Sequence, residues 1–286
     1  MIRASLRTAC LAAFVSLLGC ASAGPVRTDP EPLTVFVAID DASTARLGAF
    51  PVDRIVYARA IRAARALGAK GVALKFFFDR PAAAASDAAL AEAASELPVL
   101  MQEEEAPQDQ SDRVPPKLAR DDWSLAATPA PLALDGVRNP IAPFLAAARR
   151  VGFVQARLDD VAHKVEIAGV ADFRPIESLQ LAIVELALGK RAIVKDNRLR
   201  LGEATLPLDP RGRVACDAFA GPAPKRYGIE ALLDGKIPAR AIRGKVVVLG
   251  YARRDSPKLP VAGREVPIHE LFYRQVACLA RRVSGS

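Results

Sequence analysis

Continuous apolar runs alternate along this chain with segments whose apolar residues recur every three or four positions. Residues 33–39, 72–78 and 246–249 are apolar runs rich in β-branched residues, which is typical of strands buried on both faces. Residues 54–67 carry apolar side chains at helical spacing and arginines on the opposite stripe. This predicts an amphipathic helix that Gly68 ends. A strand, a helix and a strand in this order predict parallel strands joined by a right-handed crossover.

The same alternation continues through most of the sequence. It predicts helices over 86–95, 178–188, 227–233 and 268–281, strands over 97–101, 151–156 and 164–167, and shorter antiparallel strands at 193–194, 199–201 and 213–216. Alternating strands and helices are typical of α/β folds. We therefore expect a single α/β domain over 33–283, with a mixed, mainly parallel sheet flanked by helices.

One stretch interrupts this alternation. Residues 102–131 contain three consecutive glutamates, several glutamines and many prolines, a composition typical of a mobile surface insertion. We expect Trp123 to pin part of it to the body of the domain.

The N-terminal residues follow a third pattern. A start with two arginines precedes a short apolar run that closes on Leu17-Leu18-Gly19-Cys20, as in a secretory signal. The run is shorter than the about 20 residues that span a bilayer. A cysteine after a Leu-x-Gly triplet resembles the lipobox of bacterial lipoproteins.

The lipobox resemblance implies that residues 1–19 are a signal peptide, that Cys20 carries palmitate as part of a lipid anchor, and that residues 20–32 form a tether. Two alternatives stay open. Cleavage after Ala23 would release a soluble secreted protein, and the cysteine could stand by chance in an apolar run or a plain membrane anchor.

Composition narrows the range of functions. Hydrophobic residues make up 51% of the chain, which allows a sizeable core and excludes wholesale disorder. The formal net charge is +8, but the basic residues are scattered and are not interleaved with aromatic residues as in nucleic-acid platforms. We therefore expect no nucleic-acid partner. The membrane attachment that we expect is the one through the lipid on Cys20.

Two of the four cysteines, Cys216 and Cys278, lie in the expected domain. An oxidising compartment permits a disulfide between them. Two buried free thiols are an equally open alternative.

Charged residues follow three of the expected strands. In an open α/β sheet, ligands bind beyond the carboxyl ends of the parallel strands. If these ends converge, carboxylates could hold a hard cation and arginines an anion. The candidate ligand-binding residues are Asp40, Asp41, Arg54, Asp79, Arg253 and Asp255. The alternative is structural, because aspartates after strands often cap the next helix or turn.

Catalytic motifs are missing from the sequence. There is no Gly-x-Ser-x-Gly elbow, and Lys245 precedes a strand where a phosphate-binding loop would open a helix. His163 and His269 are too far apart in sequence to suggest a zinc site. We expect no enzyme activity, no metal and no cofactor.

Several ordered blocks resemble the second type of CHASE domain, an extracellular sensing module associated with bacterial cyclases and histidine kinases. The blocks are residues 35–43, 67–73, 87–90, 151–153, 178–182, 242–250 and 266–269. The chain departs from the family pattern at Val52, where a tryptophan is common, and at Lys75, where an acidic residue is common. For this reason no family ligand is carried over.

The resemblance implies a non-catalytic sensory or ligand-binding lipoprotein of the bacterial envelope, facing the periplasm, with the outer membrane favoured. Family members usually continue into membrane helices and an output domain, and neither follows here. We therefore expect the signal to pass to an unidentified envelope signalling protein. Alternatives are a structural or assembly lipoprotein and a metal-dependent hydrolase built on the aspartates.

Overall fold

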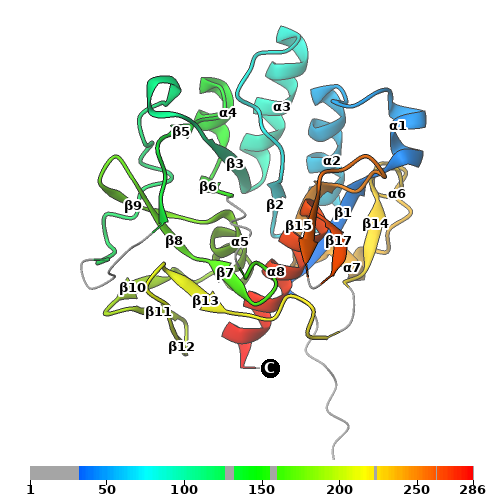
Figure 1. Cartoon of the computed structure of the whole chain (residues 1–286). Helices are drawn as coiled ribbons and strands as arrows, with labels where there is room; N and C mark the ends of the chain where they lie inside the picture. Colours follow the sequence, from blue (N-terminus) through cyan, green and yellow to red (C-terminus); the bar gives the residue numbers. More distant parts are fainter. Residues whose placement is uncertain (1–31, 126–131, 155–159, 222–223, 262, 286) are drawn as a thin grey trace, which may run out of the picture. The chain divides into compact units, whose positions relative to one another are not determined.

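The computed structural model describes residues 32–125, 132–154, 160–221, 224–261 and 263–285 (Figure 1). A central sheet carries parallel strands in the order β14-β1-β15-β2-β3-β6. Their bounds are β1 Thr34–Ile39, β2 Gly71–Leu74, β3 Val99–Glu105, β6 Arg150–Phe153, β14 Arg226–Gly228 and β15 Val246–Tyr251. The short β5 (Val137–Arg138) pairs antiparallel with the end of β3. This arrangement confirms the expected mixed, mainly parallel α/β fold.

Helices cover both faces of this sheet. Successive side chains of a strand point to opposite faces, so Val247 and Leu249 of β15 enter one core while Val246 and Val248 enter the other. The first core is covered by α2 (Arg54–Ala66), α3 (Ala84–Glu96), α4 (Ala142–Ala147), α6 (Ile229–Leu233) and α7 (Ala239–Ile242). The second core is covered by α5 (Leu179–Leu188) and α8 (Ile268–Ser284).

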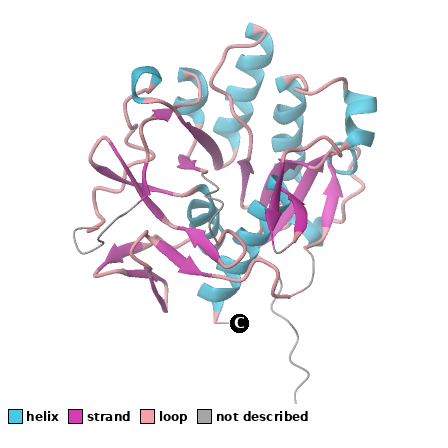
Figure 2. Cartoon of the chain, in the orientation of Figure 1, coloured by secondary structure: helices cyan, strands magenta, loops and turns pink. Residues whose placement is uncertain are grey.

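Small sheets pack against the second core (Figure 2). They consist of β8 (Ala168–Ala171) with β9 (Arg174–Glu177) and β4 (Leu132–Ala133), of β10 (Ile193–Lys195), β11 (Arg198–Leu201) and β12 (Ala204–Pro207), and of β7 (Lys164–Glu166) with β13 (Arg213–Ala215). Their strands are antiparallel except for the parallel pair β4–β8, and Ala171 and Ile176 of β8 and β9 also enter the first core. A hairpin of β16 (Lys258–Val261) and β17 (Arg264–Pro267) leads into α8. The two hairpins β8–β9 and β16–β17 were not expected from the sequence.

Several expected elements differ at their ends, among them the helix expected over 227–233, whose first residues Tyr227 and Gly228 belong to β14. The apolar run 72–78 leaves the sheet after Leu74, because its last residues form the wall of a cavity described below. Asp40 caps a short helix that was not among the expected elements, α1 (Asp41–Leu47): its carboxylate accepts a hydrogen bond from the backbone N–H of Ser43 at 3.0 Å.

The stretch predicted as a surface insertion is partly buried. β3 runs on to Glu105, a 3-10 turn, η1 (Gln108–Gln110), follows, and Leu118 and Arg120 are fully buried. Trp123 packs as expected, and its Nε1–H donates to the carbonyl of Ala192 at 3.3 Å. The surface position is thus wrong for this part, while mobility stays a prediction.

A cluster of ion pairs explains why charged side chains such as Arg120 are buried in this part of the molecule. The Arg120 guanidinium lies 2.7 Å from Glu177 and 3.0 Å from Glu185. Arg150 pairs with the same two carboxylates. We call Arg120, Arg150, Glu177 and Glu185 the buried ion-pair cluster.

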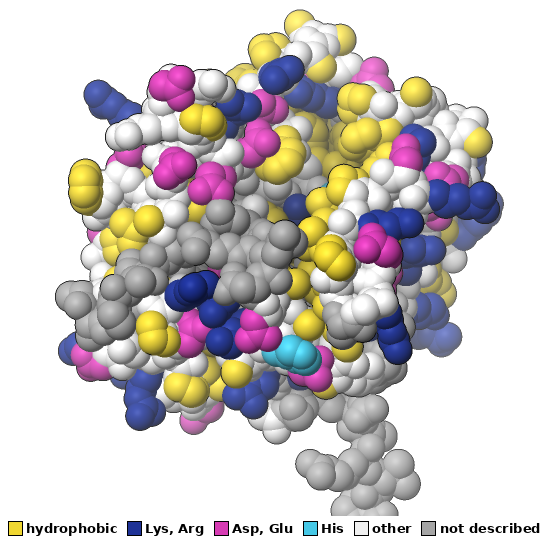
Figure 3. All heavy atoms as spheres, in the orientation of Figure 1, with side chains coloured by type: hydrophobic (Ala, Val, Ile, Leu, Met, Phe, Trp, Pro, Cys, Tyr) yellow, Lys and Arg dark blue, Asp and Glu magenta, His cyan; other side chains and the backbone are white. Residues whose placement is uncertain are grey.

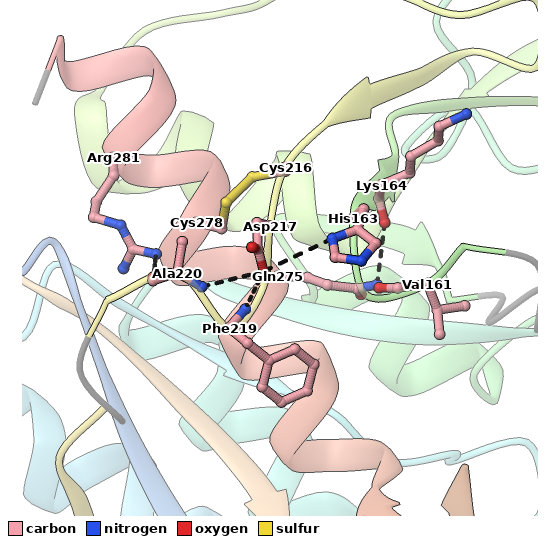
Figure 4. The surroundings of a disulfide bond; sticks show 10 residues. All are labelled: Val161, His163, Lys164, Cys216, Asp217, Phe219, Ala220, Gln275, Cys278 and Arg281. Carbon is pink, nitrogen blue, oxygen red and sulfur yellow. Dashed lines mark hydrogen bonds and ion pairs between the residues drawn. A yellow bond between two sulfur atoms is a disulfide. The ribbon is translucent and has the colours of Figure 1, made fainter. Parts of the chain in front are cut away.

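A disulfide joins Cys216 to Cys278, with the Cα atoms 6.0 Å apart (Figure 4). It ties the segment after β13 to α8. One turn earlier on α8, Gln275 donates to the carbonyl of Val161 at 3.1 Å. The C-terminal helix is therefore fixed to the antiparallel sheets at several points.

The expected signal peptide, the lipid site Cys20 and nearly all of the tether lie outside the described residues. Every helix within the described ranges is too short or too polar to span a lipid bilayer.

Candidate functional site

A cavity of about 720 Å³ opens at the carboxyl edge of the parallel strands. Lys75 follows β2, Gln102 lies in β3, Val154 follows β6, Tyr251 ends β15, and all four line it. Its volume lies within the range of small-molecule sites, about 300–1,000 Å³. Figure 3 shows hydrophobic side chains gathered in a hollow on this face, over the region of α2, β2 and β15 in Figure 1.

Aromatic side chains form the wall of the cavity. After β2 the chain stays extended enough to alternate, so that Phe76 and Phe78 are buried while Phe77 is 48% exposed. The Tyr57 ring of α2 meets Phe76 and Phe78 at centroid distances of 5.0 and 5.3 Å. Phe50 contacts Tyr251 at 4.4 Å. The wall is therefore suited to a flat, apolar ligand.

Two of the predicted residues, Arg54 and Asp79, line this cavity. Arg54 opens α2, pairs with Asp87 of α3 and lies 5.0 Å from the Phe144 ring centroid. Asp79 lies 3.6 Å from the guanidinium of Arg138. The charges of Arg54 and Asp79 are thus already balanced by other side chains of the protein.

The other four predicted residues do not line the cavity, and three of them, Asp41, Arg253 and Asp255, form a separate surface network. Arg253 lies 2.7 Å from Asp255 and 3.4 Å from Asp41. Asp40 caps α1, as described above. The hydroxyl of Tyr251 donates to Asp255 at 3.1 Å and links the two places. The six candidates therefore do not converge in one crevice.

Four polar side chains that line the cavity form what we call its floor: Lys75, Gln102, Gln180 and His269. Lys75 is the cation among them, and the sequence did not mark it as a site residue. Lys75 is 6% exposed, and its Nζ lies 5.4 Å from the Phe272 ring centroid. Among the described residues, no carboxylate forms an ion pair with it. Burial disfavours the charged ammonium and lowers the Lys75 pKa to about 7.

Two of the floor residues carry amide groups. The Oε1 atoms of Gln102 in β3 and Gln180 in α5 are buried and accept no hydrogen bond from the described residues. The orientation of Gln180 is fixed because its Nε2 donates to Gln275 at 3.0 Å. An unsatisfied buried acceptor costs about 1–3 kcal/mol, so these oxygens favour a ligand that carries a hydrogen-bond donor.

His269 completes the polar floor from the first turn of α8. Its Nδ1 accepts from the backbone N–H of Tyr251 at 3.0 Å, so the neutral ring carries its proton on Nε2. Burial, and then the charge of Lys75, hold the His269 pKa well below its usual value. The imidazole is therefore a neutral hydrogen-bond donor at neutral pH.

The floor residues carry little signal in the sequence. Lys75 stood inside an apolar run, and the glutamines have no charge that would single them out. The one available signal was the departure of Lys75 from the family pattern. In the described part of the chain, no three Asp, Glu, His or Cys side chains converge as metal ligands.

Comparison with known proteins gives one match. A family model described as the CHASE2 domain covers residues 6–278, which agrees with the resemblance seen in the ordered sequence blocks. No curated protein and no solved structure matches the chain.

Proposed function

The chain belongs to the CHASE2 family of extracellular sensory domains, and from this premise we propose that it is a non-catalytic, ligand-binding sensor of the cell envelope. The observation that carries the proposal is the aromatic cavity with its polar floor. An ammonium, two amides and a neutral imidazole are groups that orient a ligand. They lie where open α/β sheets bind ligands.

Ligand binding is tested by thermal shift with a library of small carboxylic acids, amines and neutral aromatic compounds. A ligand that binds only the native state stabilises it by about 2.7 kcal/mol at a concentration of 100 times Kd. Val52 is buried and lines the cavity, whereas Ile55 is 42% exposed and does not. We expect Val52→Trp to abolish the shift and Ile55→Trp to preserve it. No shift with any compound, or an equal shift in Val52→Trp, contradicts a ligand site in the cavity.

The sensor is further proposed to be a lipoprotein that faces the periplasm, on the evidence of the lipobox at Cys20. Palmitate labelling in cells tests this. Cys20→Ser is expected to lose the label, while Cys10→Ser, within the same signal segment, keeps it. Equal labelling of Cys20→Ser and the wild-type chain would contradict the anchor.

We further propose that the sensor passes its signal to a second envelope protein, which suits attachment by a lipid on Cys20 that enters a single leaflet. Crosslinking in intact cells, with and without a compound identified by thermal shift, tests this step. The expected result is a crosslinked partner whose yield changes with the compound. A yield independent of the compound in the wild type would contradict the transfer of a signal.

A further inference from the structure

We infer that the cavity binds an aromatic molecule with a single carboxylate, which pairs with Lys75. This inference rests on the proposed function in one respect, that the cavity is a ligand site. It adds the chemical class of the ligand.

The charges around the cavity single out Lys75. At the rim, Arg54 pairs with Asp87, and Asp79 lies within 4 Å of both Arg138 and Arg80. On the floor, the Lys75 ammonium lies over the ring of Phe272 and forms no ion pair with a carboxylate of the described residues. A buried cation needs an opposite charge to offset its lost hydration. A ligand carboxylate would supply it.

The number and type of donors favour a carboxylate over a more highly charged anion. The floor has one ammonium, and His269 is neutral with its proton on Nε2. No described residue accepts a hydrogen bond from that Nε2. A carboxylate has one negative charge and two oxygens, so it matches one cation and one additional neutral donor.

The remaining surfaces define the rest of the ligand. The unpartnered Oε1 atoms of Gln102 and Gln180 call for a donor such as a ring N–H or a hydroxyl. The wall formed by Phe76, Phe78 and Tyr57 favours an aromatic ring. An indole that carries a short carboxylate side chain has all three features.

Three compounds with the same ring separate these contributions: indole-3-acetate, indole-3-acetamide and tryptamine. In isothermal titration of the wild-type chain, we expect indole-3-acetate to bind at least about tenfold more tightly than the neutral amide, and tryptamine to bind most weakly. Lys75→Met should lose that preference for the acid and leave the amide within about twofold. Lys75→Arg should retain most of it.

Loss of folding would not mimic this result, because Met fills an apolar site and the amide reports on the remaining cavity. Equal or tighter binding of the amide or the amine overturns the inference, as does unchanged acid binding in Lys75→Met, or no binding of any of the three. A neutral or cationic library compound that binds in the cavity would still leave the proposed function standing. Failure of the whole library overturns the proposed function itself.

Discussion

The buried ion-pair cluster and the cavity differ in how the charge of a basic side chain is compensated. In the buried ion-pair cluster, Arg120 and Arg150 each contact the carboxylates of Glu177 and Glu185. In the cavity, Lys75 has no such partner among the described residues. A buried charge with a protein partner contributes to structure. A buried charge without one destabilises the fold, and it makes physical sense where a ligand supplies the partner.

The largest expected effect comes from breaking the ion-pair cluster. Arg120→Met leaves two buried carboxylates with one fewer counter-charge, which should lower the free energy of unfolding by about 3–5 kcal/mol. Urea unfolding measures the loss. Arg174→Met provides the control, because Arg174 pairs with Asp121 at the exposed surface and should cost at most about 1 kcal/mol. Similar losses in both variants would show that the cluster has no special role.

Removing the disulfide should have the next largest effect on stability, and it should also weaken ligand binding in the cavity. The bond closes a loop of 62 residues, and its loss should lower the free energy of unfolding by about 2–4 kcal/mol. α8 carries Cys278 and also the cavity residues His269 and Phe272. Cys278→Ser is therefore expected to weaken ligand binding as well, whereas equal affinity in the two proteins would separate the disulfide from the cavity.

Lys75→Met should change stability in the opposite direction from Arg120→Met. Replacing an uncompensated buried ion by an apolar side chain should raise the free energy of unfolding by about 1–4 kcal/mol. The folded Lys75 pKa is about 7, below the unfolded value of about 10.4. Between these values the unfolded state binds more protons, so wild-type stability rises with pH.

The gain from Lys75→Met should therefore be largest near or below pH ~7 and shrink toward pH ~10. Urea unfolding across this range measures it. A loss of stability at about pH 7 would mean that the lysine is compensated within the protein.

The smallest expected effect concerns Glu103, whose two carboxylate oxygens are buried without hydrogen-bond partners among the described residues. Burial, and then the neighbouring Glu105 and Glu104, raise its pKa well above the usual value. The native state then holds a proton that the unfolded state releases above pH ~4.3, so stability falls as pH rises.

Glu103→Gln keeps the shape of the protonated acid and should add about 1–2 kcal/mol at neutral pH. Thermal melts at several pH values should show a gain that grows from acid to neutral pH. A gain independent of pH would contradict a protonated Glu103.

The central sheet could be predicted because its strands are buried on both faces. Such strands consist of continuous apolar residues, as at 246–249. The surface position predicted for residues 102–131 was wrong because the buried Arg120 pairs with Glu177 and Glu185. These two carboxylates lie more than 50 residues away in the chain. Composition shows the charge of such a residue but not its pairing. The same limit explains the unexpected hairpins, whose short strands depend on tertiary packing.

The candidate site could be predicted by location more than by residue. The rule that ligands bind at the carboxyl ends of parallel strands led to Arg54 and Asp79 at the cavity. The same rule overestimated Asp40, whose role in the structure is to cap a helix. It passed over Lys75, because a lysine within an apolar run becomes informative only when its burial and its lack of a partner are known.

Proton uptake on ligand binding tests the pairing of Lys75 with a carboxylate most directly. At about pH 8, a lysine of pKa about 7 is mostly neutral. Neighbouring groups do not interfere, because His269 of the floor stays neutral and burial keeps the pKa of Tyr57 and of Tyr251 in the wall raised.

Titration calorimetry with indole-3-acetate in two buffers of different ionisation enthalpy counts the protons taken up. We expect close to one proton per molecule bound by the wild-type chain and none for Lys75→Met. Binding by the wild-type chain without proton uptake would contradict it.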